Sequence, residues 1–303
     1  MLLDRARRAL SQLKARPAGF SLVRDGEQRS QHHHNEVAVP QKTLRLLTFN
    51  VQAGIGSQRY SDYITGSWKH LVAHSRSLQN IELMANVVRN FDVVALQEVD
   101  GGSLRSRNVN QLKHMAALGK FDYHHQQLNR NLGRLGQFSN GLLSRLTPYK
   151  VEDHRLPGLP GRGAIIAHYG HPDAPLVVAG VHLSLGEKYR NIQLDYLAGQ
   201  LHRYKHVVML GDFNCRLDHL QNSPIVDLSL RSPETGLFTF PSWAPDRHID
   251  HILLSDSLSA VRTEVLDGCK LSDHLPLATE ILLPDDVLEA AQLTPPAITN
   301  QAL

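Results

Sequence analysis

The segment HVVMLGDFN, residues 206–214, contains the pattern that decides how this chain folds. Residues 207–210 are all apolar, and Gly211, Asp212 and Asn214 follow them within four positions. A strand with one solvated face alternates apolar and polar residues, so an unbroken apolar run indicates a strand that is covered on both sides. Polar side chains that directly follow such a strand lie at the rim of a sheet, where functional residues concentrate.

Other short apolar segments repeat this pattern along the chain after Pro40. On length and β-branched content, the expected strands are 44–49, 93–96, 141–143, 164–167, 176–182, 206–210 and 251–254. Apolar residues at helical spacing predict helices at 77–90, 109–118 and 188–204. The mixture of doubly apolar strands and amphipathic helices predicts an α/β protein.

The composition excludes several classes of protein. Of the 303 residues, 42% are hydrophobic and 20% are charged, which is the profile of a globular protein and excludes a disordered one. No apolar run approaches the roughly 20 residues needed to cross a bilayer. The N-terminus has no apolar core of a secretory signal, and the two cysteines form no recognisable framework, so we expect a cytoplasmic protein. The net charge is +3, and 18 histidines make it sensitive to pH.

Both ends of the chain differ from the middle. Residues 1–41 form an N-terminal extension and linker, and residues 1–16 predict a basic helix with Leu2, Ala6, Leu10 and Leu13 on one face. Such a helix is a candidate for peripheral contact with a membrane or a partner, and the alternative is a helix docked on its own domain. Residues 286–303 are rich in Ala, Pro and Gln, which favours a loose C-terminal tail.

Polar residues suited to metal or phosphate chemistry lie at almost every strand end. They are Asn50, Gln97, Glu98, His182, Asp212, Asn214, Asp250, Asp273 and His274. A single residue of this kind is usually an ordinary surface group. Because strands of one core bring their equivalent ends to a common rim, the whole set predicts a single active site.

The residue types favour a hard cation and water chemistry. Glu98, Asp273 and the amide oxygen of Asn50 are the ligands that Mg²⁺ prefers, with Mn²⁺ as the alternative ion. No HExxH motif or Cys/His cluster occurs, which makes zinc the weaker choice. Asp250 and His274 form a plausible pair in which the carboxylate orients the imidazole. The absence of GxSxG and GxxxxGK[ST] motifs disfavours a serine esterase and a P-loop NTPase.

In their order along the chain, these motifs resemble those of the endonuclease/exonuclease/phosphatase superfamily, the metal-dependent phosphoesterases that include DNase I and exonuclease III-type repair enzymes. The matching segments are LLTFN ending at Asn50, VVALQEVD around Glu98, SNGLLSR from Ser139, VVAGVHLS around His182, VVMLGDFN, RHIDHILLS around Asp250 and LSDHLPL around His274. The resemblance covers residues 44 to 283.

The resemblance implies a four-layer α/β/β/α sandwich, in which two packed mixed sheets are flanked by helices as in DNase I. It also implies that residues 42–285 form one domain. The catalytic residues that it implies are His182, Asp212, Asn214, Asp250 and His274, and the metal ligands are Asn50, Glu98 and Asp273.

The resemblance also implies a role for each of these residues. Glu98 binds the divalent cation, with Asn50 and Asp273 near it. Asp212 and Asn214 orient the attacking water and the phosphate, and His182 contacts the scissile phosphate or the leaving oxygen. His274, paired with Asp250, is the general base or a phosphate ligand. Either Asp212 or His274 takes the proton of the water.

Several further polar residues are candidates for binding the substrate. The predicted set is Arg105, Arg107, Asn140, Arg190 and Arg247, and further basic residues of the same kind are Arg130, Arg134 and Arg162. Arginine favours bidentate contacts with phosphate, and its alternative role is a surface salt bridge. Phe240 and Trp243 are candidates for stacking on bases, for contact with lipid, or for packing.

Three functions fit the sequence. The first is a divalent-metal-dependent phosphodiester hydrolase, a nuclease on DNA or RNA that uses a metal-assisted water. The second is a phosphatase or a phospholipase or sphingomyelinase-type hydrolase that acts on a lipid headgroup or a small phosphoester, which the amphipathic N-terminus and His182 modestly favour. The third is a binding protein with an inactive site, and the complete set of polar residues disfavours it.

Overall fold

The computed structural model describes residues 43–52, 74–106, 108–133, 136–158 and 160–292. Its strands are β1 (Thr43–Asn50), β2 (Val93–Asp100), β3 (Tyr123–Asn131), β4 (Gln137–Ser144), β5 (Lys150–Arg155), β6 (Gly163–His171), β7 (Ala174–His182), β8 (His206–Asp212), β9 (Asp250–Leu254), β10 (Ser259–Val265) and β11 (Leu277–Leu282). Its helices are α3 (His74–Val88), η3 (Leu104–Ser106), α4 (Gln111–Gly119), α5 (Glu187–Leu201), α6 (Leu217–Leu220), η5 (Pro224–Leu228) and α7 (Asp285–Gln292).

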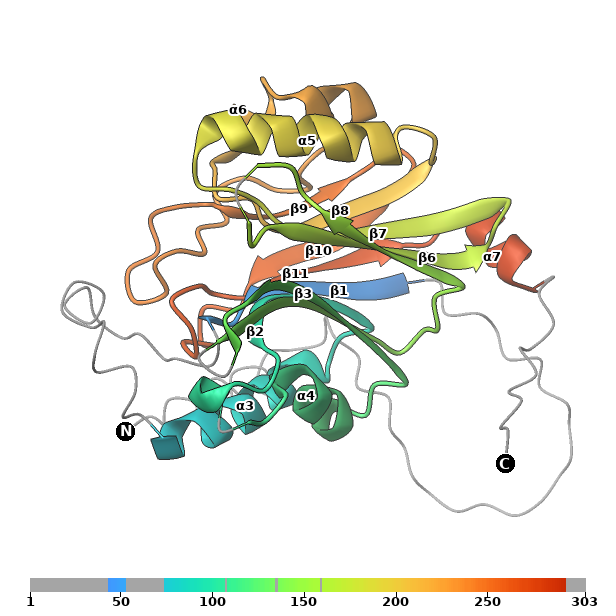
Figure 1. Cartoon of the computed structure of the whole chain (residues 1–303). Coiled ribbons are helices and arrows are strands. Elements are labelled where there is room, and N and C mark those ends of the chain that lie inside the picture. Colours follow the sequence, from blue (N-terminus) through green and yellow to red (C-terminus); the bar gives the residue numbers. More distant parts are fainter. Residues whose placement is uncertain (1–42, 53–73, 107, 134–135, 159, 293–303) are drawn as a thin grey trace, which may run out of the picture.

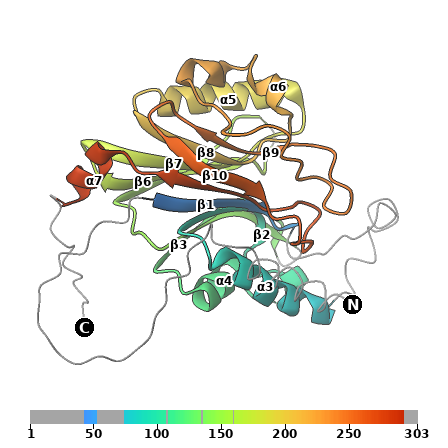
Figure 2. The same cartoon turned by 180° about the vertical axis from the view of Figure 1, so that it is seen from behind.

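The strands form two mixed sheets. The six-stranded sheet has the order β10-β11-β1-β2-β4-β3, and the five-stranded sheet has the order β5-β6-β7-β8-β9. Each sheet contains one parallel pair, β1 with β2 and β7 with β8, and its other pairs are antiparallel. The sheets lie face to face, with α3 and α4 outside one sheet and α5 and α6 outside the other (Figures 1 and 2). The predicted α/β/β/α sandwich is therefore confirmed.

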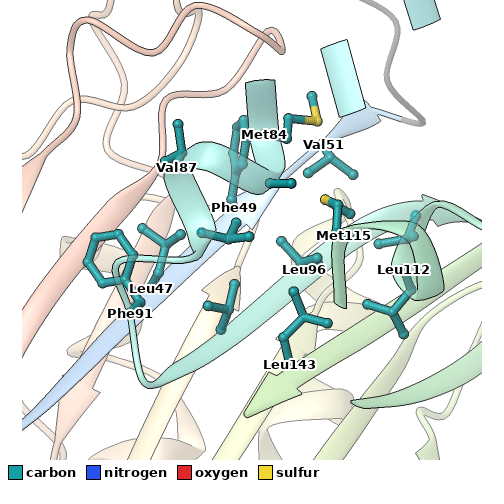
Figure 3. Packing of buried hydrophobic residues seen from close by; sticks show 14 of the residues in the cluster. Leu47, Phe49, Val51, Met84, Val87, Phe91, Leu96, Leu112, Met115 and Leu143 are labelled. Atoms are coloured by element: carbon teal, nitrogen blue, oxygen red, sulfur yellow. The ribbon is translucent and has the colours of Figure 1, made fainter. Parts of the chain in front are cut away.

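Three apolar layers hold the four layers of the sandwich together. Leu47, Phe49 and Leu96 on the outer face of the six-stranded sheet pack against Met84 of α3 and Met115 of α4 (Figure 3). A second cluster fills the space between the two sheets, and a third lies between the five-stranded sheet and α5. Because the central strands contribute to two layers each, they must be apolar on both faces, and this is the pattern that the sequence displays.

Three of the four edge strands, β3, β5 and β10, escaped sequence-based prediction, whereas the edge strand β9 was predicted at 251–254. β3 (YHHQQLNRN) and β5 (KVEDHR) are polar segments with few buried side chains, and β10 (SAVRTEV) is mostly exposed. An edge strand pairs through its backbone on one side only and needs little apolar surface, so its composition resembles that of a loop. The central strands were found, although most extend several residues beyond the predicted bounds.

The predicted helices are present with shifted ends. The helix expected at 109–118 begins at Gln111, because the side chain of Asn110 accepts a hydrogen bond from the Lys113 amide and caps the helix. The helix expected at 77–90 spans His74–Val88, and the helix expected at 188–204 spans Glu187–Leu201.

The loose tail expected after Pro284 is wrong for its first part. Helix α7 occupies Asp285–Gln292 and buries Val287 and Leu288 against β6 and β7. Asp286 binds the side chains of Lys205 and His206 at 2.7 and 3.0 Å. The expected boundary at residue 286 therefore falls inside a helix that packs on the sandwich.

Some predictions concern residues outside the described part of the chain. These are the extension 1–41 with its amphipathic helix and the last residues of the tail, 293–303. Within the described residues, no helix is both long enough and apolar enough to span a membrane.

Candidate active site

The predicted catalytic residues meet at one end of the sandwich, where the two sheets face each other. Asn50 ends β1 and Glu98 lies near the end of β2, both in the six-stranded sheet. His182 ends β7 and pairs with Asp212 at the end of β8, which in turn pairs with Asp250 at the start of β9. Both parallel pairs therefore point their carboxyl ends at the same site, as the strand-end pattern predicted.

Glu98 is aimed into the site by an irregularity in its strand. The pairing of β2 with β4 is interrupted between Leu96 and Val99, and Glu98 has a φ of 57°. A β-bulge of this kind re-aims a side chain, and a positive φ is uncommon for a residue with a Cβ atom. Burial and the neighbouring Asp273 carboxylate raise the pKa of Glu98 above its usual range. Two carboxylates that repel each other in a desolvated place form a site that favours a cation.

Asp212 lies at the centre of the site and is almost fully buried. Its Oδ2 atom accepts a hydrogen bond from Asn50 Nδ2 at 3.1 Å, and its Oδ1 atom accepts one from the Asn214 backbone amide at 2.9 Å. The Nε2 atoms of His182 and His274 lie 3.5 and 4.0 Å from Oδ2. Burial raises the pKa of Asp212, although His274 opposes this effect.

Gly211 permits the turn that presents Asp212. Its φ is 154°, and a Cβ atom there would lie 2.0 Å from the Val181 carbonyl oxygen of the neighbouring strand. Only glycine fits this position, which explains the Gly in the GDFN segment. Asn214 has a φ of 53° and donates from Nδ2 to the Leu183 carbonyl at 2.9 Å, so its side chain fastens the loop after β8 to the end of β7.

His274 forms the predicted pair with Asp250. Its Nδ1 atom lies 2.8 Å from Asp250 Oδ2, and Thr239 Oγ1 donates to the same oxygen. Burial disfavours the charged imidazole, but the Asp250 carboxylate outweighs this effect and, with Asp212 and Asp273, raises the pKa of His274 to about 10. The ring is therefore a cation at neutral pH, with Nε2–H facing Asp212.

His182, unlike His274, is uncharged at neutral pH. Burial, assisted by the nearby Arg162 guanidinium and by His274, holds the pKa of His182 well below its usual range. Arg162 Nη1 lies 3.0 Å from His182 Nδ1, and the imidazole is neutral. Among the basic residues considered from sequence whose side chains the structure describes, Arg162 is the one in hydrogen-bonding contact with a catalytic histidine.

The donor set fits a divalent cation. The oxygens of Glu98, Asp273 and Asn50 supply the carboxylate and amide ligands that Mg²⁺ prefers. Ligand atoms of Asp212, Asp250 and His274 also lie within 4.8 Å of one another. In this second group, however, Asp250 already binds the Nδ1 atom of His274, so a hydrogen-bonded pair accounts for the cluster without a metal.

The candidate substrate-binding residues are placed differently from one another. Arg247 is exposed at the rim, and its guanidinium lies 4.7 Å from the centre of the Phe240 ring, which in turn lies 4.9 Å from the His274 ring. Arg105 belongs to η3 directly after β2, while its side chain and Arg107 lie outside the described residues.

Two of these candidates are corrected by the structure. Arg190 is buried, and Nη1 donates to the carbonyls of Leu185 and Asn214 at 2.8 and 3.2 Å, so it supports the loops instead of facing solvent. Asn140 is also buried, and its Nδ2 atom donates to the Gly163 carbonyl at 2.9 Å. Arginine and asparagine side chains bind phosphate when they are exposed. Here both side chains are buried and donate to backbone carbonyls, so their role is to support the surrounding backbone.

Sequence reasoning missed Thr239, which shares the Asp250 carboxylate with His274. It lies in a loop eleven positions before Asp250, and no spacing rule connects the two residues. The TFPS segment is bonded to the SDH segment by its backbone, through Leu275 N to Thr239 O at 2.8 Å and Ser242 N to Asp273 O at 2.7 Å.

A two-sheet sandwich with paired carboxylates and histidines at one rim defines a class of phosphoester hydrolases. The chain belongs to the Endonuclease/Exonuclease/phosphatase family, whose model matches residues 47–274, and members of this family hydrolyse phosphoester bonds. A comparison with curated proteins gives no match.

Solved structures with the same fold have low sequence identity. An endonuclease/exonuclease/phosphatase from Beutenbergia cavernae is 20% identical with a TM-score of 0.60, and the match covers 80% of this chain and 72% of that one. A mannosyl-6-phosphatase from Bacteroides thetaiotaomicron is 20% identical with a TM-score of 0.59 and coverages of 79% and 100%. D. rerio TDP2 complexed with a single-strand DNA product is 15% identical with a TM-score of 0.58 and coverages of 80% and 100%.

Proposed function

We propose that this protein is a divalent-metal-dependent phosphodiester hydrolase and that its substrate is DNA or RNA. The observation that carries the proposal is the arrangement around Asp212. A cationic His274 and a neutral His182 face the same oxygen of this carboxylate, and Glu98 lies 3.9 Å from His182. Such a site places a proton acceptor, a cationic hydrogen-bond donor and a ligand for a metal ion around one phosphate group.

In the proposed mechanism, Asp212 takes the proton of the attacking water. His274 is already protonated, so it serves as a donor to a phosphoryl oxygen through Nε2–H, while Asp250 holds Nδ1. Asp212 is buried, and its raised pKa makes it a stronger base than an exposed aspartate. We therefore propose Asp212, and not His274, as the group that takes the proton of the water.

Positive charge stabilises the phosphoryl oxygens as water attacks. The Arg162 side chain, beside His182, supplies part of this charge. Glu98, Asp273 and Asn50 would hold the cation, and Mg²⁺ bound there supplies a Lewis acid for the same oxygens. Neutral His182 then binds the phosphate or the leaving oxygen without adding charge of its own.

The rim of the site supports a nucleic acid substrate. The guanidinium of exposed Arg247 lies over the Phe240 ring, and the centre of the Trp243 ring lies 6.5 Å from the centre of the same ring. An arginine combined with aromatic rings can bind a phosphate and stack on a base. A fold relative is described in complex with a single-strand DNA product, in agreement with this choice.

The alternative is a phosphatase or a phospholipase or sphingomyelinase-type hydrolase that acts on a lipid headgroup or small phosphoester. Leu185, which follows β7 by three residues, is 74% exposed, and Phe238 near His274 is 44% exposed. Apolar side chains at the rim would contact acyl chains. Another fold relative is described as a mannosyl-6-phosphatase.

Replacement of Glu98 tests the proposed activity. Purified wild-type protein and Glu98→Gln are incubated with Mg²⁺ and with labelled single- and double-stranded DNA, RNA, bis-p-nitrophenyl phosphate and phospholipid vesicles. We expect turnover of nucleic acid by the wild type, its loss with EDTA, and a decrease of about 10²-fold or more in Glu98→Gln, because a metal ligand is removed.

The matched control is Glu82→Gln, which changes an exposed glutamate of α3 in the same way and should leave turnover unchanged. Cleavage of phospholipid alone would favour the alternative substrate. Full activity of Glu98→Gln, or turnover that EDTA does not affect, would contradict the proposed metal site.

A further inference from the structure

Two amide side chains of the six-stranded sheet reach across to the five-stranded sheet beside the active site. Gln127 on β3 donates from Nε2 to the carbonyls of Ala164 and His154 at 3.0 and 3.1 Å. Asn140 on β4 donates from Nδ2 to the Gly163 carbonyl at 2.9 Å. Both amides are almost completely buried. The rest of the interface between the two sheets is an apolar cluster, whose contacts do not depend on angle. The hydrogen bonds of the two amides do depend on angle and distance, so they add a geometric constraint to this interface.

One of the three acceptor carbonyls, that of Gly163, lies next to catalytic groups. Gly163 directly follows Arg162, and its partner on β7 is His182. On the other side, Asn140 is opposite the bulge that carries Glu98, because the β2–β4 pairing stops at Leu96 and resumes at Val99. The two amides therefore connect β3 and β4 with β5 and β6. Strand β4 pairs with β2, which carries Glu98, and β6 follows Arg162 and pairs with β7, which carries His182.

Gly163 allows this close approach. A Cβ atom there would lie 2.2 Å from Gln127 Oε1 and 2.3 Å from Asn129 Oδ1. These contacts are shorter than any that a side chain tolerates, so β6 lies as near to the amides of β3 as a backbone without a side chain permits. A side chain at residue 163 would therefore have to displace the side-chain amides of Gln127 and Asn129.

We propose that Gln127 and Asn140 are positioning residues for the hydrolysis. They fix the distance between the two sheets at the active site. In this way they keep Arg162 in contact with His182 and keep these two residues facing Glu98 on the other sheet. This inference rests on the proposed function, because it assigns the amides a role in the same reaction. A displacement of about 1 Å in a catalytic group costs on the order of 10²-fold in rate, so the effect is measurable.

The test uses variants that keep the shape of each side chain and remove its N–H donors, namely Asn140→Asp and Gln127→Glu. We expect kcat on the substrate that the wild type cleaves to fall about 10-fold or more, while KM changes by less than about threefold, because the displaced Arg162 acts on charge that develops in the transition state. Gln126→Glu is the matched control. Its amide donates to Ser139 Oγ within the six-stranded sheet, so kcat should stay unchanged.

A double-mutant cycle with Arg162→Ala separates positioning from general damage. If Asn140 acts through Arg162, Asn140→Asp has little further effect in the Arg162→Ala protein, whereas independent losses would multiply. Multiplied losses, or wild-type kcat in both amide variants, would overturn the positioning role. A wild type without phosphodiester turnover would contradict the proposed function instead.

Folding of each variant is checked by circular dichroism and thermal unfolding. If Asn140→Asp does not fold, Asn140→Ser takes its place. The serine side chain is too short to reach the Gly163 carbonyl, and it adds no charge. Gln127→Glu, on a separate strand, gives the same expected loss of kcat independently of Asn140.

Discussion

His182 and His274 lie on either side of the same Asp212 oxygen, and their surroundings hold them in opposite protonation states. His182 is buried beside Arg162, and both effects disfavour a proton on its ring. His274 is equally buried, but the Asp250 carboxylate at 2.8 Å favours the charged form and outweighs burial. Residue type alone therefore does not assign the acid and base roles of this site, because the neighbouring charges decide them.

The substitution Asp250→Asn tests whether the Asp250 carboxylate determines the protonation state of His274. Without the Asp250 carboxylate, the pKa of His274 should fall from about 10 toward its ordinary value, because the largest effect that opposes burial is removed and only Asp212 and Asp273 still favour the charged ring. Wild-type activity should persist with rising pH until His274 loses its proton near pH 10, whereas the variant should lose activity at a lower pH. The pH dependence of kcat and the titration of the His274 ring by NMR measure the effect.

Asp256→Asn serves as the control for this experiment, because it neutralises an exposed aspartate that pairs with Arg231 away from the site. An unchanged alkaline limb in Asp250→Asn would show that the carboxylate does not govern the charge of His274.

At the level of elements, Arg145 connects two helices to a sheet. It follows β4 and donates to the carbonyls of Phe91, Lys120, Gly119 and Arg89, at the ends of α3 and α4. Its guanidinium also lies 5.0 Å from the centre of the Phe121 ring. The planar group with five donors satisfies several carbonyls that have no partner inside the helices.

Arg145→Lys should destabilise the protein without changing its chemistry. Lysine cannot reach several carbonyls at once, so we expect the free energy of unfolding to fall by roughly 1–3 kcal/mol. Arg145 lies at the end of β4 away from the active site, and kcat should remain at the wild-type value. Denaturant unfolding measures the loss. Arg231→Lys, at an exposed arginine, is the control, and an equal stability of both variants would contradict the connecting role.

At the level of the whole molecule, the histidines make stability depend on pH. Several have a lowered pKa, among them the buried His168, His248 and His251 and the half-buried His154. His251 is fully buried and donates from Nε2 to the Cys215 carbonyl at 2.8 Å. Burial and the adjacent His248 lower the pKa of His251 to about 3. The unfolded chain therefore binds more protons than the folded one between this value and the ordinary histidine pKa.

Acidification should consequently remove stability at these histidines from about pH 6.5 downward, whereas Asp212, whose pKa is raised in the folded protein, contributes in the opposite direction. A histidine that stays neutral when folded and has a pKa of about 6.5 when unfolded costs about 2 kcal/mol of stability by pH 5. Between pH 7.5 and pH 5, the unfolding temperature should decline less in His251→Gln than in the wild type, because the variant lacks the histidine that stays neutral when folded. A decline that is as steep in His251→Gln would assign the effect to other groups.

Much of this architecture was determined by the sequence itself. The doubly apolar strands at 44–49, 93–96 and 206–210 predicted sheets covered on both sides, because a central strand of this sandwich has no solvated face. The polar residues at the strand ends predicted the rim and the residues that meet there, including Asp212 and His274. Such patterns are local, and the chain displays them in its order of residues.

Only the tertiary structure decided the rest. The polar edge strands, the helix α7 and the burial of Arg190 and Asn140 have no local signal, because they depend on which surfaces the folded sheets and loops present. The Thr239 contact with Asp250, the bonds of Gln127 across the sheets and the different protonation states of His182 and His274 arise between segments far apart in the sequence. Hydrogen bonds and pKa values follow from distance and burial in space, and these exist only once the two sheets have packed.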